Sequence, residues 1–296
     1  MRIKVVCGCD TSENVTKRFI RNYVTYENST PYFQLTYDDN YDALIVLNKT
    51  HEHILSHKDK TFGFIMEPSW SPNWDRNIGA YCNTVFFHDL SLLGKIPSKE
   101  SFIESPSFMF YHMDQEPIAR YIDRMNAFQK TKPMSYVVKN FSPRDHNRLG
   151  WKRVELAHQI LQSDLPIDIF GYGWDVIHDN RIKGSLENKE DGLRDYMFSI
   201  AIENSSENNY LTEKFIDCLL CDSVPVYFGA PNASDIYSGH PFIGLDLFGD
   251  AIEQLRNIIA NSQALYKKIN ISSAKREYFK RYNIYDKVIE MLLSKK

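Results

Sequence analysis

Lys214 is the residue whose type and position most suggest chemistry, because it lies in the first turn of a predicted helix. Thr212 is a typical N-cap residue, and the apolar side chains that follow recur on one helical face: Phe215, Ile216, Leu219 and Leu220. A lysine at this end opposes the helix dipole unless an anion joins it. Free backbone N–H groups and a lysine together suit a phosphate group. The alternative interpretation is a solvated Lys214 beside a Glu213 that complements the dipole.

Glu67 is a second candidate, because it directly follows the apolar run 61–66, which predicts a buried strand. Pro68 ends that strand, and an aromatic loop with Trp70 and Trp74 comes next. A carboxylate in an aromatic pocket has its pKa raised by desolvation, and it can then accept a proton from a sugar hydroxyl. Exposure in a loop is the commoner fate of a glutamate, so both interpretations stay open at this point.

The elements that must hold Lys214 are two apolar runs, at 198–202 and 224–228, one on each side of its helix. Each run has the length of a single buried strand, and Gly229 ends the second. Strand, helix and strand form a βαβ unit, in which the strands are parallel and the connection is right-handed. A polar loop, 203–211, links the first strand to the helix.

The same alternation of strands and helices extends along the chain and predicts an α/β fold with parallel sheets covered on both faces. Further strands are predicted at 3–8, 43–47, 61–66, 81–88, 134–138, 167–170 and 242–245, while 102–112 fits either a strand or a loop. Further helices are predicted at 11–24, 115–128, 150–161, 251–262, 274–282 and 284–294. In such folds functional groups lie just beyond the carboxyl ends of the strands. We place a domain boundary at 131–133, before the strand at 134–138.

The composition is that of an ordinary soluble globular chain, and 296 residues are enough for two domains. A net charge of −3 gives no global basic field for nucleic acid or membrane, and no apolar run reaches the length of a transmembrane helix. Met1 leads directly into a predicted strand, so we expect no signal peptide. Lysines at the C-terminus could touch acidic lipid, although ordinary helix capping is the simpler interpretation.

The five cysteines do not follow the spacing of a disulfide framework. Cys7 and Cys9 end the first predicted strand, and Cys218 and Cys221 lie among leucines on the Lys214 helix. A metal site is one interpretation of these pairs, but buried free thiols are the more common arrangement. Reduced cysteines imply a reducing compartment, so we expect a cytoplasmic protein.

Several stretches of the chain together resemble the α-1,3/1,4-fucosyltransferases, which form glycosyltransferase family 10. The donor-binding signature of that family is similar to Glu203-Asn-Ser205, then Tyr210-Leu-Thr-Glu-Lys214, then Val224-Pro-Val226 followed by Gly229. A second landmark of the family resembles Arg153-Val-Glu-Leu156 together with the run Ile167-Asp-Ile-Phe-Gly-Tyr-Gly173. Around Glu67 the similarity is partial, because the family often has Gly-Glu-Asn where this chain has Met66-Glu67-Pro68.

The resemblance implies a GT-B architecture, in which two Rossmann-like domains face a cleft. Residues 1–130 would form the acceptor-binding domain and residues 131–296 the GDP-fucose-binding domain, with the last helix packing back on the first domain. In the second domain the resemblance assigns the donor diphosphate to Arg153 and Lys214, and the ribose hydroxyls to Glu213. It assigns the placing of the diphosphate and the fucose to Asn204 and Tyr210.

The resemblance also implies the reaction, an inverting transfer of L-fucose from GDP-fucose to a hydroxyl of a glycan acceptor. An α-1,3 or α-1,4 link to a GlcNAc- or Glc-type sugar is expected. Glu67 would be the general base, with Glu104 as the alternative carboxylate, and Lys152 is an alternative to Arg153. The chain has no Asp-x-Asp triplet, which holds a divalent metal in many other glycosyltransferases. We therefore expect no essential metal and no cofactor.

Two other functions stay open on the same scaffold. A related transferase that uses another nucleotide sugar would keep Lys214 and Glu213, which would contact only the diphosphate and the ribose. A catalytically inactive glycan- or nucleotide-binding protein is the second, and the departure from the family pattern around Glu67 favours it. The first half of the chain resembles the family least, so the sequence identifies neither the acceptor nor the oligomeric state.

Overall fold

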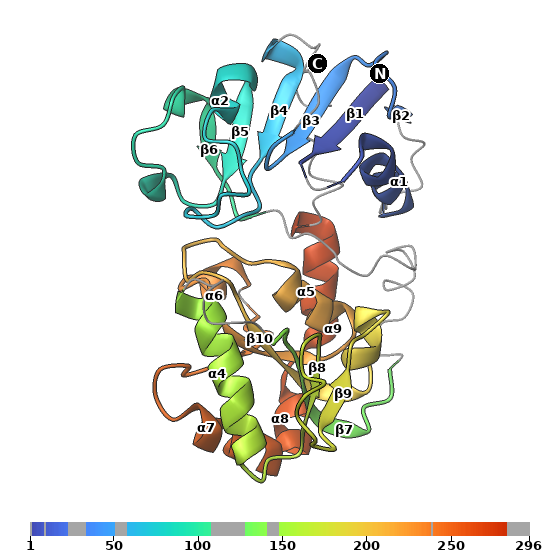
Figure 1. Cartoon of the computed structure of the whole chain (residues 1–296), viewed down its shortest axis with the longest axis vertical. Helices are drawn as coiled ribbons and strands as arrows, with labels where there is room; N and C mark the ends of the chain where they lie inside the picture. The colour runs from blue at the N-terminus through green and yellow to red at the C-terminus, as the bar shows by residue number, and fades with distance from the viewer. Residues whose placement is uncertain are drawn as a thin grey trace.

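The computed structural model describes residues 2–8, 10–22, 34–50, 58–107, 128–140, 148–237 and 239–282, without the side chains of 18–22. Within these ranges the chain forms two six-stranded sheets. The sheets lie one above the other along the long axis of the molecule, and loops at the carboxyl ends of their strands lie between them (Figure 1). The predicted α/β class is therefore confirmed.

The first sheet has the strand order β2-β1-β3-β4-β5-β6, and every neighbouring pair is parallel. All residues of β3 and β4 are buried, as expected for central strands of a covered parallel sheet. The strands are β1 (Arg2–Cys7), β2 (Gln34–Thr36), β3 (Ala43–Leu47), β4 (Thr61–Phe64), β5 (Thr84–Phe87) and β6 (Phe102–Glu104). The helical elements are α1 (Ser12–Asn22), η1 (Lys58–Lys60), α2 (Ile78–Tyr81), η2 (Leu90–Leu92) and η3 (Lys99–Ser101).

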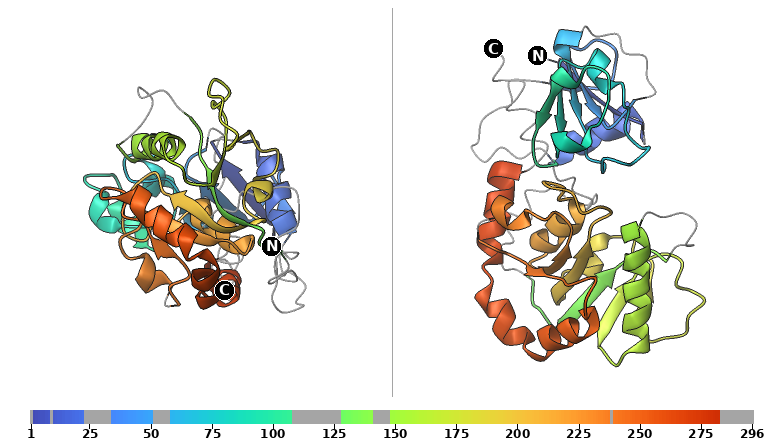
Figure 2. Two further views of the ribbon diagram at one scale, coloured as in Figure 1. Left: turned by 90° about the horizontal axis from the view of Figure 1, so that it is seen from below. Right: turned by 90° about the vertical axis from the view of Figure 1, so that its left-hand side faces the viewer.

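The second sheet has the order β12-β11-β10-β7-β8-β9 and is also parallel throughout. Its strands are β7 (Lys132–Val137), β8 (Ile167–Phe170), β9 (Ile182–Gly184), β10 (Tyr196–Ile202), β11 (Val224–Phe228) and β12 (Ile243–Gly244). Its helical elements are α4 (Arg148–Gln162), η5 (Lys189–Gly192), α5 (Glu213–Leu220), α6 (Ala233–Ile236), α7 (Ala251–Ala260), α8 (Ser262–Lys268), α9 (Ile271–Glu277) and η6 (Tyr278–Tyr282). Helices cover both faces of this sheet, with α4 on one side and α8 and α9 on the other (Figure 2).

The βαβ unit around Lys214 is confirmed by the structure. All seven residues of β10 are buried, and β10 pairs in parallel with β11. Between them α5 buries Phe215, Ile216, Leu219 and Leu220, which are the residues of the predicted apolar face. Gly229 ends β11, and a Cβ there would lie only 2.4 Å from Cγ of Glu203. Glycine is thus required where β11 passes the loop that follows β10.

Several element boundaries differ from those predicted. Tyr81 ends α2 instead of beginning a strand, so β5 covers only Thr84–Phe87 of the predicted 81–88. The predicted helix 251–262 divides at Asn261 into α7 and α8, and α9 begins before 274, because the Asn270 side chain caps it. Two strands of only three residues, β2 and β9, were not predicted, because such short segments show no periodicity.

Some predictions fall outside the described residues. The helix 284–294 does so entirely, and the helix 115–128 does so except for its last residue. Strands of the first sheet come from residues 2–104 and those of the second from 132–244. The boundary at 131–133 and the packing of the last helix stay predictions. No helix in the described ranges has the length and apolar character needed to span a membrane.

Candidate active site

The start of α5 is held in place by Glu203, which follows β10 and is fully buried. Its carboxylate accepts hydrogen bonds from the backbone N–H of Thr212 at 2.7 Å and from the Thr212 hydroxyl at 2.6 Å. Thr212 in turn caps α5, since its Oγ1 accepts from the N–H of Lys214. Burial raises the pKa of Glu203. Glu203 therefore closes the loop 203–212 against its own half of the molecule.

Lys214 occupies the first turn of α5, as predicted, and its side chain is 15% exposed. Its Nζ lies 2.9 Å from Oε1 of Glu213, 3.1 Å from Oγ1 of Thr212 and 3.5 Å from Oε2 of Glu203. The anion that a lysine at this position requires is therefore supplied within the chain by two carboxylates. A donor diphosphate would have to compete with them for the ammonium group.

Arg153 reaches the same place from α4. Its Nη1 donates a hydrogen bond of 2.8 Å to Oδ1 of Asn204, which follows Glu203 in the loop. Its Nε is buried and has no hydrogen-bond partner among the described residues. A small cavity of about 20 Å³ is lined by Arg153, Lys214 and Lys189, whose Nζ lies 2.5 Å from Oδ2 of Asp217. Arginine and lysine are the usual phosphate ligands, but a phosphate group would have to displace the carboxylates that pair with Lys189 and Lys214.

Tyr210 is buried, with its ring centroid 5.2 Å from that of His88 in the first half of the chain. Burial, together with the negative charges of Glu203, Glu213 and Glu67, raises the pKa of its phenol well above the usual value. Tyr210 thus lies where the two halves meet.

Glu67 is half-buried and lies in a turn that follows β4. Its Oε2 accepts a hydrogen bond of 2.9 Å from the hydroxyl of Ser71, a residue that is only 1% exposed. The N–H of Ser71 donates to the carbonyl of Pro68 at 3.0 Å, and the indole N–H of Trp74 donates to the same carbonyl at 3.3 Å. We call residues 67–71 the base turn. The Glu67 carboxylate is therefore oriented by a residue of its own turn, Ser71.

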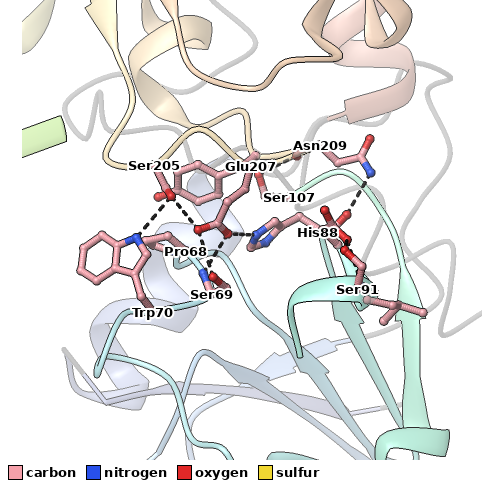
Figure 3. A network of polar contacts seen from close by, with 12 residues as sticks. Pro68, Ser69, Trp70, His88, Ser91, Ser107, Ser205, Glu207 and Asn209 are labelled. Atoms are coloured by element: carbon pink, nitrogen blue, oxygen red, sulfur yellow. Dashed lines mark hydrogen bonds and ion pairs between the residues drawn. The ribbon is translucent and has the colours of Figure 1, made fainter. Parts of the chain in front are cut away.

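Glu207, in the loop 203–212, joins the base turn to the second half. Its Oε2 accepts a hydrogen bond of 2.9 Å from the backbone N–H of Ser69 and lies 2.5 Å from Nε2 of His88. Its Oε1 accepts hydrogen bonds from the hydroxyl of Ser69 at 3.0 Å and from the hydroxyl of Ser205 at 2.6 Å. Figure 3 shows these contacts, with Ser69 below the carboxylate, His88 beside it and Ser205 above it. The indole N–H of Trp70 also donates to Ser205 Oγ, at 3.2 Å. We call these residues the Glu207 network.

Ionisation of Glu207 follows from these contacts. Burial alone would raise its pKa, but the hydrogen bonds from His88, Ser205 and Ser69 outweigh burial and lower the pKa to about 2. An ionised carboxylate only accepts hydrogen bonds, so His88 must carry its proton on Nε2. Nδ1 of His88 is buried and has no hydrogen-bond partner among the described residues.

Sequence reasoning missed Glu203, Glu207 and His88 as site residues. His88 follows β5 directly, so the argument that selected Glu67 at the end of β4 could also have found it. Nothing in the polar loop distinguishes Glu207 from its neighbours, because its partners are 119 and 138 positions away. Glu104, the alternative base, is exposed at the end of β6 and accepts a hydrogen bond of 3.0 Å from the N–H of Leu90.

The sequence analysis predicted free thiols and no essential metal. Among the described residues no group of three or more His, Cys, Asp or Glu side chains could hold a metal ion. Cys7, Cys82, Cys218 and Cys221 form no disulfide among the described residues. Cys218 and Cys221 are buried, as expected, whereas Cys7 is half-buried, and burial raises the pKa of Cys218 to about 12. Independence from metals is not decided by this geometry and stays a prediction.

Known proteins resemble this chain mostly over short segments. Alpha-(1,3)-fucosyltransferase 7 of Bos taurus is 31% identical over 140 residues, which are 45% of this chain and 36% of that protein. The alpha-(1,3)-fucosyltransferase FucT of Helicobacter pylori is 26% identical over 88 residues, which are 29% of this chain and 18% of that protein. The chain thus covers well under two thirds of the length of these relatives.

The fold and the family are established by two broader matches. The crystal structure of an alpha1,3-fucosyltransferase with GDP-fucose superimposes with a TM-score of 0.53 and 16% identity, over 91% of this chain and 80% of that one. This similarity confirms the GT-B fold. The model of the family described as "Glycosyltransferase family 10 (fucosyltransferase) C-term" matches residues 127–281, a stretch that includes Arg153, Asn204 and Lys214. Since this match spans more than half of the 296 residues, the chain belongs to glycosyltransferase family 10.

Proposed function

We propose that the chain is an inverting fucosyltransferase that moves L-fucose from GDP-fucose to a hydroxyl of a glycan, with Glu67 as the general base. The observation that carries this proposal is the convergence of Arg153, Asn204 and Lys214 at one sheet edge, within the stretch that matches the family. The relatives are named as fucosyltransferases, and the similar crystal structure contains GDP-fucose, which supports the same sugar and the same donor. An α-1,3 or α-1,4 link to a GlcNAc- or Glc-type sugar is the expected product.

On the donor side, Lys214 and Arg153 would bind the diphosphate. The negative charge on GDP grows as the bond between fucose C1 and the phosphate oxygen breaks, so cations fixed at this place stabilise the transition state. Asn204 holds the Arg153 fork through its Oδ1 at 2.8 Å. Once a diphosphate takes over Lys214, the carboxylate of Glu213 becomes available to accept hydrogen bonds from the ribose hydroxyls.

On the acceptor side, Glu67 would take the proton of the attacking hydroxyl. The oxygen then attacks C1 of fucose from the face opposite to GDP, so one C–O bond forms as the other breaks and the configuration at C1 is inverted. Proton removal by a positioned carboxylate is ordinary general-base catalysis. Trp70, which belongs to the base turn and is 48% exposed, offers an aromatic face on which a pyranose ring can stack.

The proposal is tested by incubating the purified chain with GDP-fucose, GDP-mannose or UDP-galactose and a panel of galactose- and N-acetylglucosamine-containing glycans. We expect transfer from GDP-fucose alone, with NMR of the product showing inversion at C1. Transfer from a different nucleotide sugar would establish the related transferase instead. GDP binding in calorimetry without turnover of any donor would establish an inactive binding protein.

Two further properties are part of the proposal. Activity is expected to persist in EDTA, because cationic side chains would neutralise the diphosphate, and loss of activity that Mg²⁺ or Mn²⁺ restores would contradict this. We also expect a cytoplasmic location with weak contact to a membrane surface. Fractionation of cells that produce the protein, with and without a salt wash of the membranes, checks the location.

A further inference from the structure

The Glu207 network connects the two halves through the base turn. The carboxylate is 9% exposed and accepts four hydrogen bonds from described residues, of which two come from the N–H and the hydroxyl of Ser69. Ser69 is the middle residue of the base turn, and Glu207 belongs to the loop that also carries Asn204. The contact between the halves thus links the turn of Glu67, which would take the proton, to the loop of Asn204, which would bind the donor.

Contacts within the base turn connect Ser69 to the orientation of Glu67. Ser71 donates its hydroxyl to Glu67 and its backbone N–H to the carbonyl of Pro68, so the turn is closed on both sides of Ser69. Arg76 supports the same turn by donating to the carbonyl of Ser71 at 3.0 Å. A shift of Ser69 would therefore move the Glu67 carboxylate with the turn.

The charge of Glu207 also depends on the first half. Taking a carboxylate out of water is costly unless charged or hydrogen-bonding partners replace the solvent. His88 and Ser69 supply these partners from the first half, and the positive charge of Arg76 acts on Glu207 as well. When the halves meet, the carboxylate thus exchanges water for Ser69 and His88, which donate three of its four hydrogen bonds.

We propose that Glu207 is a positioning residue for the transfer reaction: from the donor-binding half it holds the base turn so that the Glu67 carboxylate faces the fucose. This inference rests on the proposed function. Glu207 touches neither substrate in this arrangement, and it acts through Ser69 and the turn. The alternative is that Glu207 has only a structural role and stabilises the contact between the two halves.

A double-mutant cycle separates these two roles. Glu207→Gln keeps the side-chain volume but replaces one accepting oxygen by an NH₂ group, which only donates. This group would face another hydrogen-bond donor, either Ser69 or the ring N–H of His88. We expect kcat to fall by about 10- to 100-fold, as for other residues that orient a reacting group, while the Kd of GDP changes by less than about twofold. In a Glu67→Gln background the same substitution should lower the residual kcat by less than about twofold, because the group that Glu207 positions is already lost.

Ser107→Ala is the matched control. The Ser107 hydroxyl joins the halves by donating to the carbonyl of Leu211 at 2.7 Å, but it does not contact the base turn. We expect this variant to keep kcat within about twofold of the unmodified protein. A similar loss of kcat in Ser107→Ala and Glu207→Gln would show that fastening alone matters and would overturn the proposal.

Other outcomes also decide the question. Equal losses of kcat from Glu207→Gln in both backgrounds, or a loss confined to GDP affinity, would overturn the positioning role. If Glu207→Gln does not fold, Ser69→Ala removes one of the four hydrogen bonds, and a three- to tenfold loss of kcat that vanishes in the Glu67→Gln background is expected. If the unmodified protein transfers no fucose, the proposed function itself fails. If it transfers fucose and these variants keep the same kcat, only the positioning role of Glu207 fails.

Discussion

Glu203 and Glu207 belong to one loop, yet they serve different parts of the molecule. Glu203 turns back to Thr212 within its own half, whereas Glu207 reaches Ser69 and His88 in the other half. Burial raises the pKa of Glu203. The pKa of Glu207 is instead lowered to about 2 by the hydrogen bonds that Glu207 itself accepts. A single loop thus holds the start of α5 through one carboxylate and the base turn through another.

This division leads to a rule for the effects of substitutions. Changes on the Glu207 side should lower turnover and leave GDP affinity nearly unchanged, since they act on the base turn. Changes on the Glu203 side should weaken GDP binding, because they act on the start of α5 and on Lys214. The predictions below test that rule.

The largest effect is expected for Glu67→Gln, at the far end of the Glu207 side. A positioned general base contributes about 10²- to 10⁴-fold, so kcat should fall by that factor while the Kd of GDP stays unchanged. Glu104→Gln is the control, because Glu104 is an exposed carboxylate at another strand end of the same sheet. Steady-state kinetics with the best acceptor measures both, and a fully active Glu67→Gln beside an inactive Glu104→Gln would reassign the base.

A somewhat smaller effect is expected for Lys214→Ala, on the Glu203 side. Loss of one cation at a developing negative charge costs about 10²- to 10³-fold in kcat/KM. Unlike Glu67→Gln, this variant should also weaken GDP binding, which calorimetry measures directly. Unchanged GDP affinity in Lys214→Ala would break the distinction between the two sides of the loop.

The βαβ unit and the place of Lys214 were predictable because their causes are local. The N-cap Thr212, the apolar face of α5 and the strand-ending Gly229 are neighbours in sequence, and the structure places them as expected. The central strands of the first sheet were also predictable, since buried apolar runs of strand length such as β3 and β4 are typical of a covered parallel sheet.

The contact between the halves was not predictable in the same way. The partners of Glu207 come from turns after two strands of the other sheet, and no pattern in a single sequence states how two sheets face one another. The pairing of Lys214 with Glu203 and Glu213 was not predicted either, because the two interpretations of Lys214 were contact with an external anion and contact with solvent. Periodicity thus predicted the helices and strands, and the position after a strand made Glu67 a candidate. Which other residues lie near it depends on contacts between residues far apart in sequence.

Opposite pH dependences are expected for the two glutamates of the loop. The lowered pKa of Glu207 means that its contribution to stability is present above about pH 4.3, the usual glutamate value, and is lost as the pH falls toward 2. The raised pKa of Glu203 means that its ionisation lowers stability as the pH rises. Urea unfolding between pH 3 and pH 7 compares the unmodified protein with Glu207→Gln and Glu203→Gln.

The loss caused by Glu207→Gln should grow with pH to about 1–3 kcal/mol, the usual scale for hydrogen bonds to a charged group. The loss caused by Glu203→Gln should shrink over the same range. Parallel pH curves for the two variants would contradict the different environments of the two carboxylates.

The smallest effect is expected for Lys152→Ala, which tests how sharply the donor site is bounded. Lys152 was an alternative to Arg153, but its Nζ lies 2.7 Å from Oε2 of Glu155 on the same helix. A helical i,i+3 pair of this kind is worth about 0.2–0.5 kcal/mol. Arg153 instead donates to Asn204 and lines the cavity shared with Lys214. Lys152→Ala should therefore keep kcat/KM and GDP affinity within about threefold, while Arg153→Ala weakens both. Equal losses in the two variants would mean that general positive charge near α4, rather than the fork held by Asn204, binds the diphosphate.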